Sequence, residues 1–457
     1  MAQLTLEQTI EVAKKQSYTT QLLQKDLSAA NLAYRIYRAN LRPTLLFFGN
    51  APGFNKDNYA VTQPDGSIKF PGRHQNYSSA GVGFSQPIPY TGGMISVNTD
   101  LYRFDDFTAN TKQYNGTPVF VRLAQPLFRF NPYKWDKQIA PLKLKETSQE
   151  VKLAILQLEY EVCRLYFDII EAQSNEQLAA VNLQHNTTNL SIEKRRLELG
   201  VSTEDRVLQL EIQQINSQQQ QITGQLNTQK TFLALQTYIN LPDIRIQKLD
   251  LPDKLPSLTI DKEKAIGLAT QNLPVFLTFQ REKLEAGSAI DQAKKQGRDI
   301  DLVASYGLNN TAPDIPAIYR SPQDQQRFNI SFNIPIADWG RRKNSLAAVR
   351  LREDQLDILH KQVTAKFTTE IRNLATELPV LQPAVEQSLL LDTLSQRRFT
   401  ITNRLFQSGK ASLLELQAAQ TEKDNARRNH IAALRKFWES YYLFRVKTGT
   451  ENPWNIR

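Results

Sequence analysis

The feature that most constrains this chain is a long run of apolar residues separated by alternating steps of four and three. The run comprises Val151, Ile155, Leu158, Val162, Leu165, Ile169 and Ala172. This heptad spacing predicts a helix with a narrow apolar seam that must pack along a partner. Because only Pro141 interrupts residues 135–199, the pattern predicts one helix about 90 Å long at 1.5 Å per residue.

A second seam of the same spacing follows and predicts a helical hairpin. It comprises Leu208, Ile212, Ile215, Gln219, Ile222 and Leu226. Between the two seams, Gly200 suits the left-handed position that ends a helix, and Ser202 or Thr203 suits the cap that begins the next. In the second half of the chain, Pro379 and Pro383 are expected to interrupt the corresponding long helix.

Short blocks with period-two alternation predict β-strands. In residues 302–308 and 328–336, apolar side chains alternate with small or polar ones. Each block matches a membrane strand with one face to lipid and one to a lumen, although a strand of a soluble sandwich carries the same alternation. The polar, proline-containing segment 310–326 is expected to be an exposed loop.

Landmarks that recur in the same order predict an internal duplication. The pairs are residues 9–13 and 265–269, 88–93 and 334–340, and 199–203 and 407–412. The first repeat is expected at 1–247, with helices in 4–41, a strand region at 43–130 and a long helical hairpin at 135–240. A linker at 248–257 precedes the second repeat at 258–457, with helices in 260–298, strands in 300–337 and a hairpin at 339–448.

Composition excludes several function classes. The 56 Lys and Arg exceed the 46 Asp and Glu only slightly, and basic residues 194–196 beside Glu193 read as a solvated helix face, so nucleic-acid binding is not expected. The single Cys163 excludes disulfides and a zinc–thiolate site and is expected to be a small buried residue. The four His are isolated and no phosphate-binding loop or nucleophile elbow is present, so no enzyme activity, metal or cofactor is expected.

Neither half of the chain can bury its apolar surface alone. Long helices with narrow seams need lateral partners, and a few membrane strands leave open edges that lipid does not tolerate. Several copies of the chain would solve both problems if they contributed strands to one barrel and helices to one cylinder. Such an assembly would form a conduit. A coiled-coil scaffold or binding protein outside the membrane is the alternative, favoured by the long helices and by an N-terminus without signal-peptide features.

Several short motifs resemble the TolC-like outer-membrane efflux family over nearly the whole chain. They are LTLEQ at 4–8, SQP at 85–87, QPLF at 125–128, DWGRR at 338–342 and the two glycine turns. The resemblance implies an α+β membrane protein: a homotrimer that completes a 12-stranded outer-membrane β-barrel continuous with a periplasmic α-helical barrel. It also implies a secreted chain whose signal peptide has been removed.

The function that the resemblance implies is the exit duct of a tripartite efflux or secretion system. Such a duct is a passive conduit for small molecules or peptides. An ABC or proton-driven inner-membrane pump drives export through a periplasmic adaptor.

The resemblance also implies site residues. It places the two turns at the periplasmic tips, and the candidate adaptor-docking residues are Leu199, Gly200, Val201, Ser202, Ser408, Gly409, Lys410 and Ala411. Glu415 is a candidate pore-entrance gate or an acid favoured by the dipole at a helix N-terminus. Segment 50–116 is longer than the family's usual first strand pair. Its extra hairpin either adds strands to the barrel or forms an extracellular cap or plug, and we favour the cap.

Basic residues flank the predicted junctions between helices and strands. The candidates for a lipid-facing basic collar are Arg298, Arg341, Arg342 and Lys343. Such a collar would face the anionic head groups of the outer membrane, where each charge contributes about 1 kcal/mol. The alternative is ordinary solvated helix ends.

Overall fold

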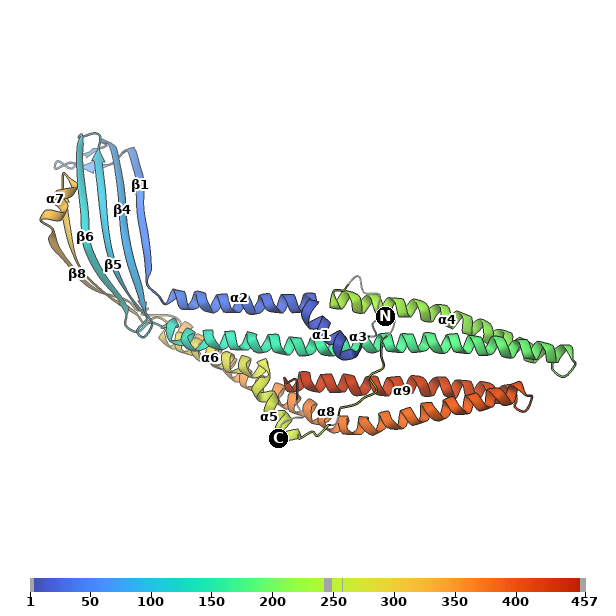
Figure 1. The fold of residues 1–457 in the computed structure, drawn as a ribbon. Coiled ribbons are helices and arrows are strands. Elements are labelled where there is room, and N and C mark those ends of the chain that lie inside the picture. Colours follow the sequence, from blue (N-terminus) through green and yellow to red (C-terminus); the bar gives the residue numbers. More distant parts are fainter. Residues whose placement is uncertain (1–3, 242–248, 257, 453–457) are drawn as a thin grey trace. The chain divides into compact units, whose positions relative to one another are not determined.

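The computed structural model describes residues 4–241, 249–256 and 258–452, which fold into two compact units (Figure 1). Unit 1 contains Met1–Ala29, Glu146–Leu277 and Lys361–Arg457, and unit 2 contains Ala30–Lys145 and Thr278–His360. Each unit therefore draws on both halves of the sequence. Of the predicted linker, residues 248 and 257 lie outside the described ones, whereas Leu249 is buried in unit 1.

The helices dominate unit 1 and extend into unit 2. They are α1 (Leu6–Gln16), α2 (Tyr18–Asn40), α3 (Pro132–Glu198), α4 (Glu204–Ile239), α5 (Lys262–Asn272), α6 (Pro274–Lys295), α7 (Ile315–Arg320), α8 (Arg341–Gln407) and α9 (Leu413–Thr448). The longest, α3 and α8, have 67 residues each, which confirms the very long helix predicted from the heptad seam.

The helix α8 continues through Pro379 and Pro383, so the predicted interruption was wrong. Proline removes one backbone hydrogen bond and crowds the preceding turn. Here the side chains around the two prolines are held by packing, because Leu378 and Val385 are both buried. Tertiary contacts of the apolar face therefore outweigh the local cost.

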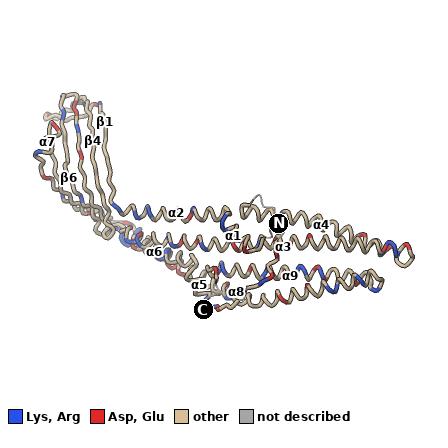
Figure 2. Tube along the Cα trace, viewed as in Figure 1, with Lys and Arg blue, Asp and Glu red and all other residues tan. Residues whose placement is uncertain are grey.

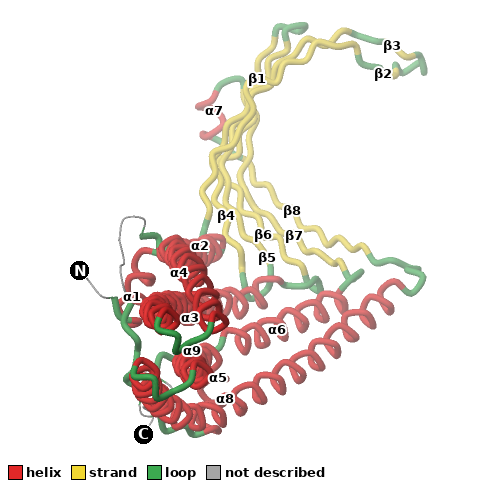
Figure 3. The backbone as a smooth tube through the Cα atoms, turned by 90° about the vertical axis from the view of Figure 1, so that its right-hand side faces the viewer, coloured by secondary structure: helices red, strands yellow, loops and turns green. Residues whose placement is uncertain are grey.

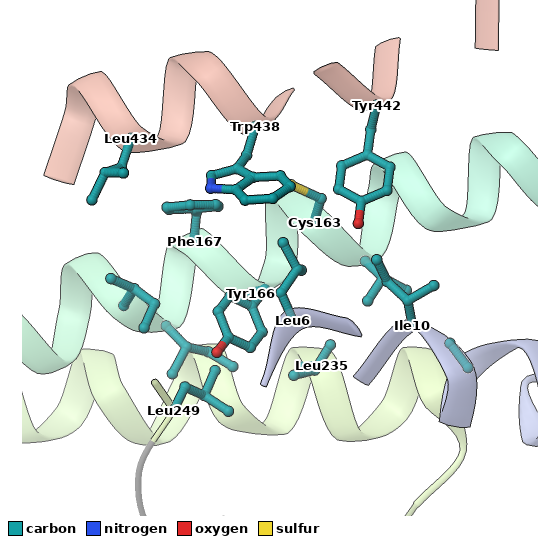
Figure 4. Packing of buried hydrophobic residues seen from close by; sticks show 14 of the residues in the cluster. Leu6, Ile10, Cys163, Tyr166, Phe167, Leu235, Leu249, Leu434, Trp438 and Tyr442 are labelled. Carbon is teal, nitrogen blue, oxygen red and sulfur yellow. The ribbon is translucent and has the colours of Figure 1, made fainter. Parts of the chain in front are cut away.

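The core of unit 1 forms where α1 packs against α3 and α9 (Figure 4). Leu6 and Ile10 from α1 pack with Tyr166 and Phe167 of α3 and with Trp438 of α9. Burial of a large apolar side chain contributes roughly 1.5–3 kcal/mol, so this cluster anchors the helices. The seam residues Leu158, Val162 and Ile169 are buried in it as the heptad pattern predicts.

Cys163 lies in the same core, beside Trp438 (Figure 4). Burial raises the pKa of the Cys163 thiol well above its usual value. A thiol that stays protonated is a poor nucleophile, and the expectation of a small buried residue is confirmed.

Unit 2 contains a single antiparallel sheet of six strands, in the order β1-β4-β5-β6-β7-β8 (Figure 3). Its strands are β1 (Thr44–Asn58), β4 (Gly72–Ile88), β5 (Gly93–Asp106), β6 (Thr111–Pro126), β7 (Asp299–Ala312) and β8 (Gln323–Asn333). The short strands β2 (Val61–Thr62) and β3 (Ile68–Lys69) pair with each other in the connection between β1 and β4.

The favoured extracellular cap was wrong, because the extra hairpin in segment 50–116 lies in the main sheet. Strand β1 pairs with β4 from Thr44 opposite Ser85 to Asn58 opposite Gly72. Strand β4 in turn pairs with β5 along residues 75–88. The backbone groups of the hairpin are satisfied by these two ladders, which a separate cap would leave open on one side.

The sheet has one apolar and one polar face, as the alternation predicts. Paired residues point to the same side of a sheet, and one such row runs through Leu45, Phe84, Val97, Val121 and Tyr306. The adjacent row of paired residues is polar.

The polar row runs through Ser85, Ser96, Arg122, Ser305 and Arg327. This second row lies on the other face because successive residues of a strand alternate sides. The sheet is therefore amphipathic across its whole width.

The expected exposed loop at 310–326 is mostly ordered structure. Strand β7 runs to Ala312, and helix α7 fills much of the remaining segment. Asp314 caps this helix by accepting a hydrogen bond from the Ala317 amide at 2.9 Å. Ile318 is fully buried over Gly116, where an added Cβ would lie only 2.7 Å from the Ile318 side chain.

Within the described ranges, no helix combines the length and the apolar character that crossing a membrane requires.

Candidate functional site at the two helical turns

The hairpin of α3 and α4 ends in a turn fixed by Gly200. Its φ of 73° lies in the left-handed region that favours glycine. The Gly200 amide donates to the Leu197 carbonyl at 2.9 Å, and the Val201 amide donates to the Arg196 carbonyl at 2.9 Å. This pair of bonds is the Schellman arrangement that satisfies the last carbonyls of a helix.

The hairpin of α8 and α9 ends in the same way at Gly409. Its φ is 77°, its amide donates to the Phe406 carbonyl at 3.0 Å, and the Lys410 amide donates to the Leu405 carbonyl at 2.8 Å. The two predicted turns thus share one backbone geometry, at corresponding places in the two halves of the chain.

The first turn exposes apolar side chains. Leu199 is 77% exposed and Val201 is 68% exposed, and an added Cβ at Gly200 would meet no atom within 4 Å. Of the other predicted docking residues, Ser408, Gly409 and Lys410 are exposed. The rest, Ser202 and Ala411, are half-buried, and Ala411 packs against the apolar cluster behind the turns.

A buried ion pair ties the two turns together. The Arg196 guanidinium donates to Glu193 at 2.9 Å and to the carbonyls of Phe406 and Gln407 at 2.9 and 3.1 Å. Glu193 is only 1% exposed and also accepts a short hydrogen bond from the Ser202 hydroxyl. A cation at the end of α8 complements the helix dipole and its free carbonyls.

The interpretation of residues 194–196 beside Glu193 as a solvated helix face was therefore wrong for two of these residues. Glu193 lies six heptads after Val151, so it continues the apolar seam of α3 as a buried position. The heptad register of α3 was therefore the feature of the sequence that could have predicted the burial of Glu193. Arg195, by contrast, is exposed as expected.

Buried polar side chains lie along α3 behind the turns. Asn189 donates to Asn403 of α8 at 3.0 Å, and Asn186 donates to Ser217 of α4 at 2.9 Å. These amides are matched in pairs, as buried polar groups must be. The apolar periodicity of the helix does not reveal these amides, because they are polar.

A buried lysine lies deeper along the same helices. The Lys423 ammonium of α9 donates to Asn182 at 2.9 Å, lies 3.1 Å from Asp424 and sits 4.4 Å above the Phe399 ring. Burial, followed by the charge of Lys423, lowers the pKa of the neighbouring His185. The cluster links α3, α8 and α9 through charge and hydrogen bonds.

Glu415 is placed at the start of α9. Its carboxylate accepts hydrogen bonds from the Ser412 amide at 2.7 Å and the Ser412 hydroxyl at 2.9 Å, while the Glu415 amide donates back at 3.2 Å. These bonds form a capping box and lower the pKa of Glu415. The geometry gives Glu415 the helix-start role that was one of its two expected readings.

An apolar stripe along α4 has no partner within the described chain. It comprises Leu208, Ile212, Ile215, Ile222, Leu226 and Leu233, each at least 50% exposed. The buried residues Leu210, Ser217 and Gly224 lie on the opposite side of the helix. The second predicted seam therefore faces away from α3.

The four residues of the predicted basic collar lie at helix–strand junctions of unit 2, where Figure 2 shows Lys and Arg gathered. Arg298 precedes β7, and Arg341, Arg342 and Lys343 form the first turn of α8. None of the four pairs with an acidic side chain in the described parts of the chain. Cations at a helix N-terminus oppose its dipole, and here the Asp338 carboxylate caps that end by accepting hydrogen bonds from the amides of Gly340 and Arg342 at 3.0 and 3.2 Å.

The described residues contain no cluster of His, Cys, Asp and Glu that could hold a metal ion.

Comparison with solved structures places this fold among outer-membrane channels. VceC of Vibrio cholerae superposes with a TM-score of 0.70 at 15% identity, covering 97% of this chain and 96% of that one. CmeC of Campylobacter jejuni gives 0.68 at 14% identity, covering 97% and 85%. MtrE of Neisseria gonorrhoeae, solved in an open state, gives 0.64 at 16% identity, covering 97% and 89%.

At the level of sequence, no curated protein matches the chain. The family described as outer membrane efflux protein does match it, over residues 10–241 and 278–440. Proteins of this family are channels rather than enzymes. The match covers most of both units and leaves the coiled-coil scaffold without support. The chain belongs to the outer membrane efflux protein family and is an outer-membrane exit duct with a periplasmic helical extension.

Proposed function

We propose that three copies of this chain form the exit duct, and that its two turns dock a periplasmic adaptor that links it to an inner-membrane pump. The observation that carries the docking surface is the pair of matching turns joined through Arg196. The turn fixes the backbone of Leu199 and Val201, and the apolar side chains of both residues are exposed to solvent. A preformed turn lowers the ordering cost of binding.

Photo-crosslinking tests the docking surface. A photoreactive residue at Val201 or Lys410 should link to a periplasmic adaptor in cells that express the whole export system. The same residue at the exposed Gln225 of α4 should not, because it lies away from the turns. An assembled trimer whose Val201 and Lys410 variants link to no second protein would contradict the docking proposal.

A separate proposal concerns Glu415 as an acidic gate at the entrance. Glu415→Gln tests it, because glutamine can keep the capping box while removing the charge. We expect single-channel conductance and cation preference in a planar bilayer to change in this variant. The matched control is Ser412→Ala, which removes the cap and keeps the charge. Equal currents in wild type and Glu415→Gln would leave Glu415 with its capping role alone.

The basic collar is proposed to face anionic head groups. Replacing Arg341, Arg342 and Lys343 with Gln should weaken insertion into anionic vesicles, since each charge contributes about 1 kcal/mol near such a surface. Insertion into neutral vesicles should stay unchanged. The control replaces three exposed basic residues farther along α8, Arg350, Arg352 and Lys361. Equal insertion of both triple variants would contradict the collar.

A further inference from the structure

The sheet of unit 2 ends in two strands that run in opposite directions. Because its six strands alternate in direction, β1 and β8 are antiparallel to each other. Each pairs on one side only among the strands that the structure describes. A copy placed beside this one can therefore join its β1 to the free edge of β8 as an ordinary antiparallel pair.

We propose that three copies close an 18-stranded barrel through this seam, with an open lumen lined by the polar face of each sheet. The number follows from three sheets of six strands, and it rests on the trimer of the proposed function. It replaces the 12 strands that four-stranded protomers would give.

The apolar face supports a seam at these two edges. Phe47 of β1 is 80% exposed and Phe332 of β8 is 77% exposed in the single chain. Phe332 pairs with Ile300, on the same face as the apolar row through Leu45. The apolar band thus reaches both edges, and joining them makes it continuous around a barrel. Strand edges left open and apolar would otherwise pair with the edges of other chains and cause aggregation.

The extra hairpin is built into the sheet by its side chains as well as by its backbone. The Phe48 ring lies on the polar face against Gly81 and Gly83, and an added Cβ at Gly81 would come within 2.7 Å of the ring. A 12-stranded barrel would need β1 and β4 to leave the sheet. That change would separate β4 from β5 along residues 75–88 and leave one edge of each strand unpaired.

The larger strand number changes what the lumen can hold. Barrel diameter grows roughly in proportion to strand number, so 18 strands give about 1.5 times the diameter of 12 and about twice the cross-section. Barrels of this size leave an aqueous channel rather than a side-chain core. Hydrated, polar cargo then fits without losing its water.

Besides the carboxylates of Asp100 and Asp106 on β5, the polar face carries two arginines, Arg122 and Arg327. Both point to the polar face, in one row with Ser96 and Ser305, and both are exposed. Neither pairs with an acidic side chain within the described ranges. Three copies bring six such guanidinium groups into the lumen beside these carboxylates, and charged side chains that line a pore set its ion selectivity.

Cysteine crosslinking tests the seam, since the native Cys163 is buried and serves as background. One cysteine replaces Phe328, Ile330 or Phe332 in β8, and a second replaces Phe47 in β1. We expect at least one pair to give disulfide-linked dimers and trimers on oxidation. The matched control puts the second cysteine at Val97 of β5, on the same apolar face but inside the sheet, and should give none.

The outcomes separate the barrel from the trimer. Links from β8 to β5, or a trimer by light scattering that links through neither strand, would overturn the 18-stranded barrel and leave the duct standing. The absence of any trimer would overturn the proposed function itself.

Reversal potentials in a planar bilayer test the arginines. The double variant Arg122→Gln and Arg327→Gln should lower the ratio of anion to cation permeability. The control is Arg103→Gln, which removes one arginine from the opposite face of the sheet, where Arg103 pairs with Asp105 at 2.9 Å. An unchanged ratio in the double variant would contradict a lumen lined by the polar face, while the crosslinks would still decide the strand number.

Discussion

Arg196 is the residue on which the geometry of both turns depends. It neutralises the buried Glu193 of its own helix and at the same time satisfies the last carbonyls of α8. Its neighbour Arg195 is exposed and pairs with no acidic side chain in the described chain. The two arginines therefore offer a matched comparison at adjacent positions.

Replacing Arg196 with Ala should loosen both turns. The change leaves the Glu193 carboxylate buried without a counter-charge, which costs about 3 kcal/mol or more when one partner of a buried pair is removed. Hydrogen exchange should rise at residues 197–202 and at 406–410. Arg195→Ala should leave both segments unchanged, and equal exchange in the two variants would show that the ion pair does not hold the turns.

His430 predicts a dependence of stability on pH. The ring is 2% exposed, and its Nδ1 lies 3.0 Å from the Ser388 hydroxyl. Burial, and then the charge of Arg427, lowers the pKa of His430 below 6.5, against the opposing charges of Asp392 and Asp253. Below pH 6.5 the unfolded chain gains a proton that the folded chain resists, so stability falls as the pH falls through this window.

Thermal unfolding between pH 7 and pH 5 measures this effect. We expect the melting temperature to drop toward pH 5 and the drop to shrink in His430→Gln. Burial also lowers the pKa of His185, so a double variant with His185→Gln should flatten the profile further. A wild-type profile that rises toward pH 5 would contradict the assignment.

At the scale of the elements, the exposed stripe of α4 is the clearest unsatisfied surface of unit 1. Ile215 and Ile222 are each 62% exposed and lie two turns apart on one face. Such a stripe at heptad spacing fits the seam of a neighbouring helix. A second copy of the chain supplies long helices of the same kind.

Charged side chains introduced on this stripe should prevent the assembly of copies without affecting the folding of the protomer. Ile215→Asp with Ile222→Asp should leave the helical content of the protomer unchanged, because neither side chain packs in its core. The variant should fail to form trimers, as measured by light scattering in detergent. Gln220→Asp with Asn227→Asp, two exposed residues on a different face of α4, should still assemble, and trimers of the isoleucine variant would place the subunit contact elsewhere.

Some elements of this fold could be predicted from the sequence and others could not, for physical reasons. The long helices α3 and α8 and the two glycine turns follow from local periodicity and backbone preference. Strand β4 could not be read in the same way, because residues 72–80 are mostly polar and their pairing with β1 and β5 is set by distant partners. Helix α7 depends on Ile318 finding the space above Gly116, which no local pattern encodes.

The site was predictable in position but not in its internal chemistry. The turns were found from Gly200 and Gly409. The contact of Arg196 with the end of α8 was not, because it joins residues 210 positions apart. Buried polar positions along α3 become visible only when the heptad register is followed through polar residues such as Asn186 and Glu193.

At the scale of the whole molecule, the single chain is incomplete in two separate ways. The sheet of unit 2 has two open edges with apolar side chains, and α4 of unit 1 has an apolar stripe without a partner. The proposed association of copies would satisfy both, and the family of outer-membrane efflux proteins consists of trimers. The same association would enclose a lumen between the polar faces of the sheets.

The purified protein should therefore require detergent and behave as a complex of three 52.2 kDa chains once bound detergent is subtracted. Apolar edges that are open in the monomer become paired in the closed barrel, so the complex should resist dilution. Inserted into a planar bilayer, it should give stable ion-conducting steps, which the assembly-deficient α4 variant should not. A monomer that stays soluble without detergent and gives no conductance would contradict the duct, because a closed polar lumen is the one feature that conduction cannot do without.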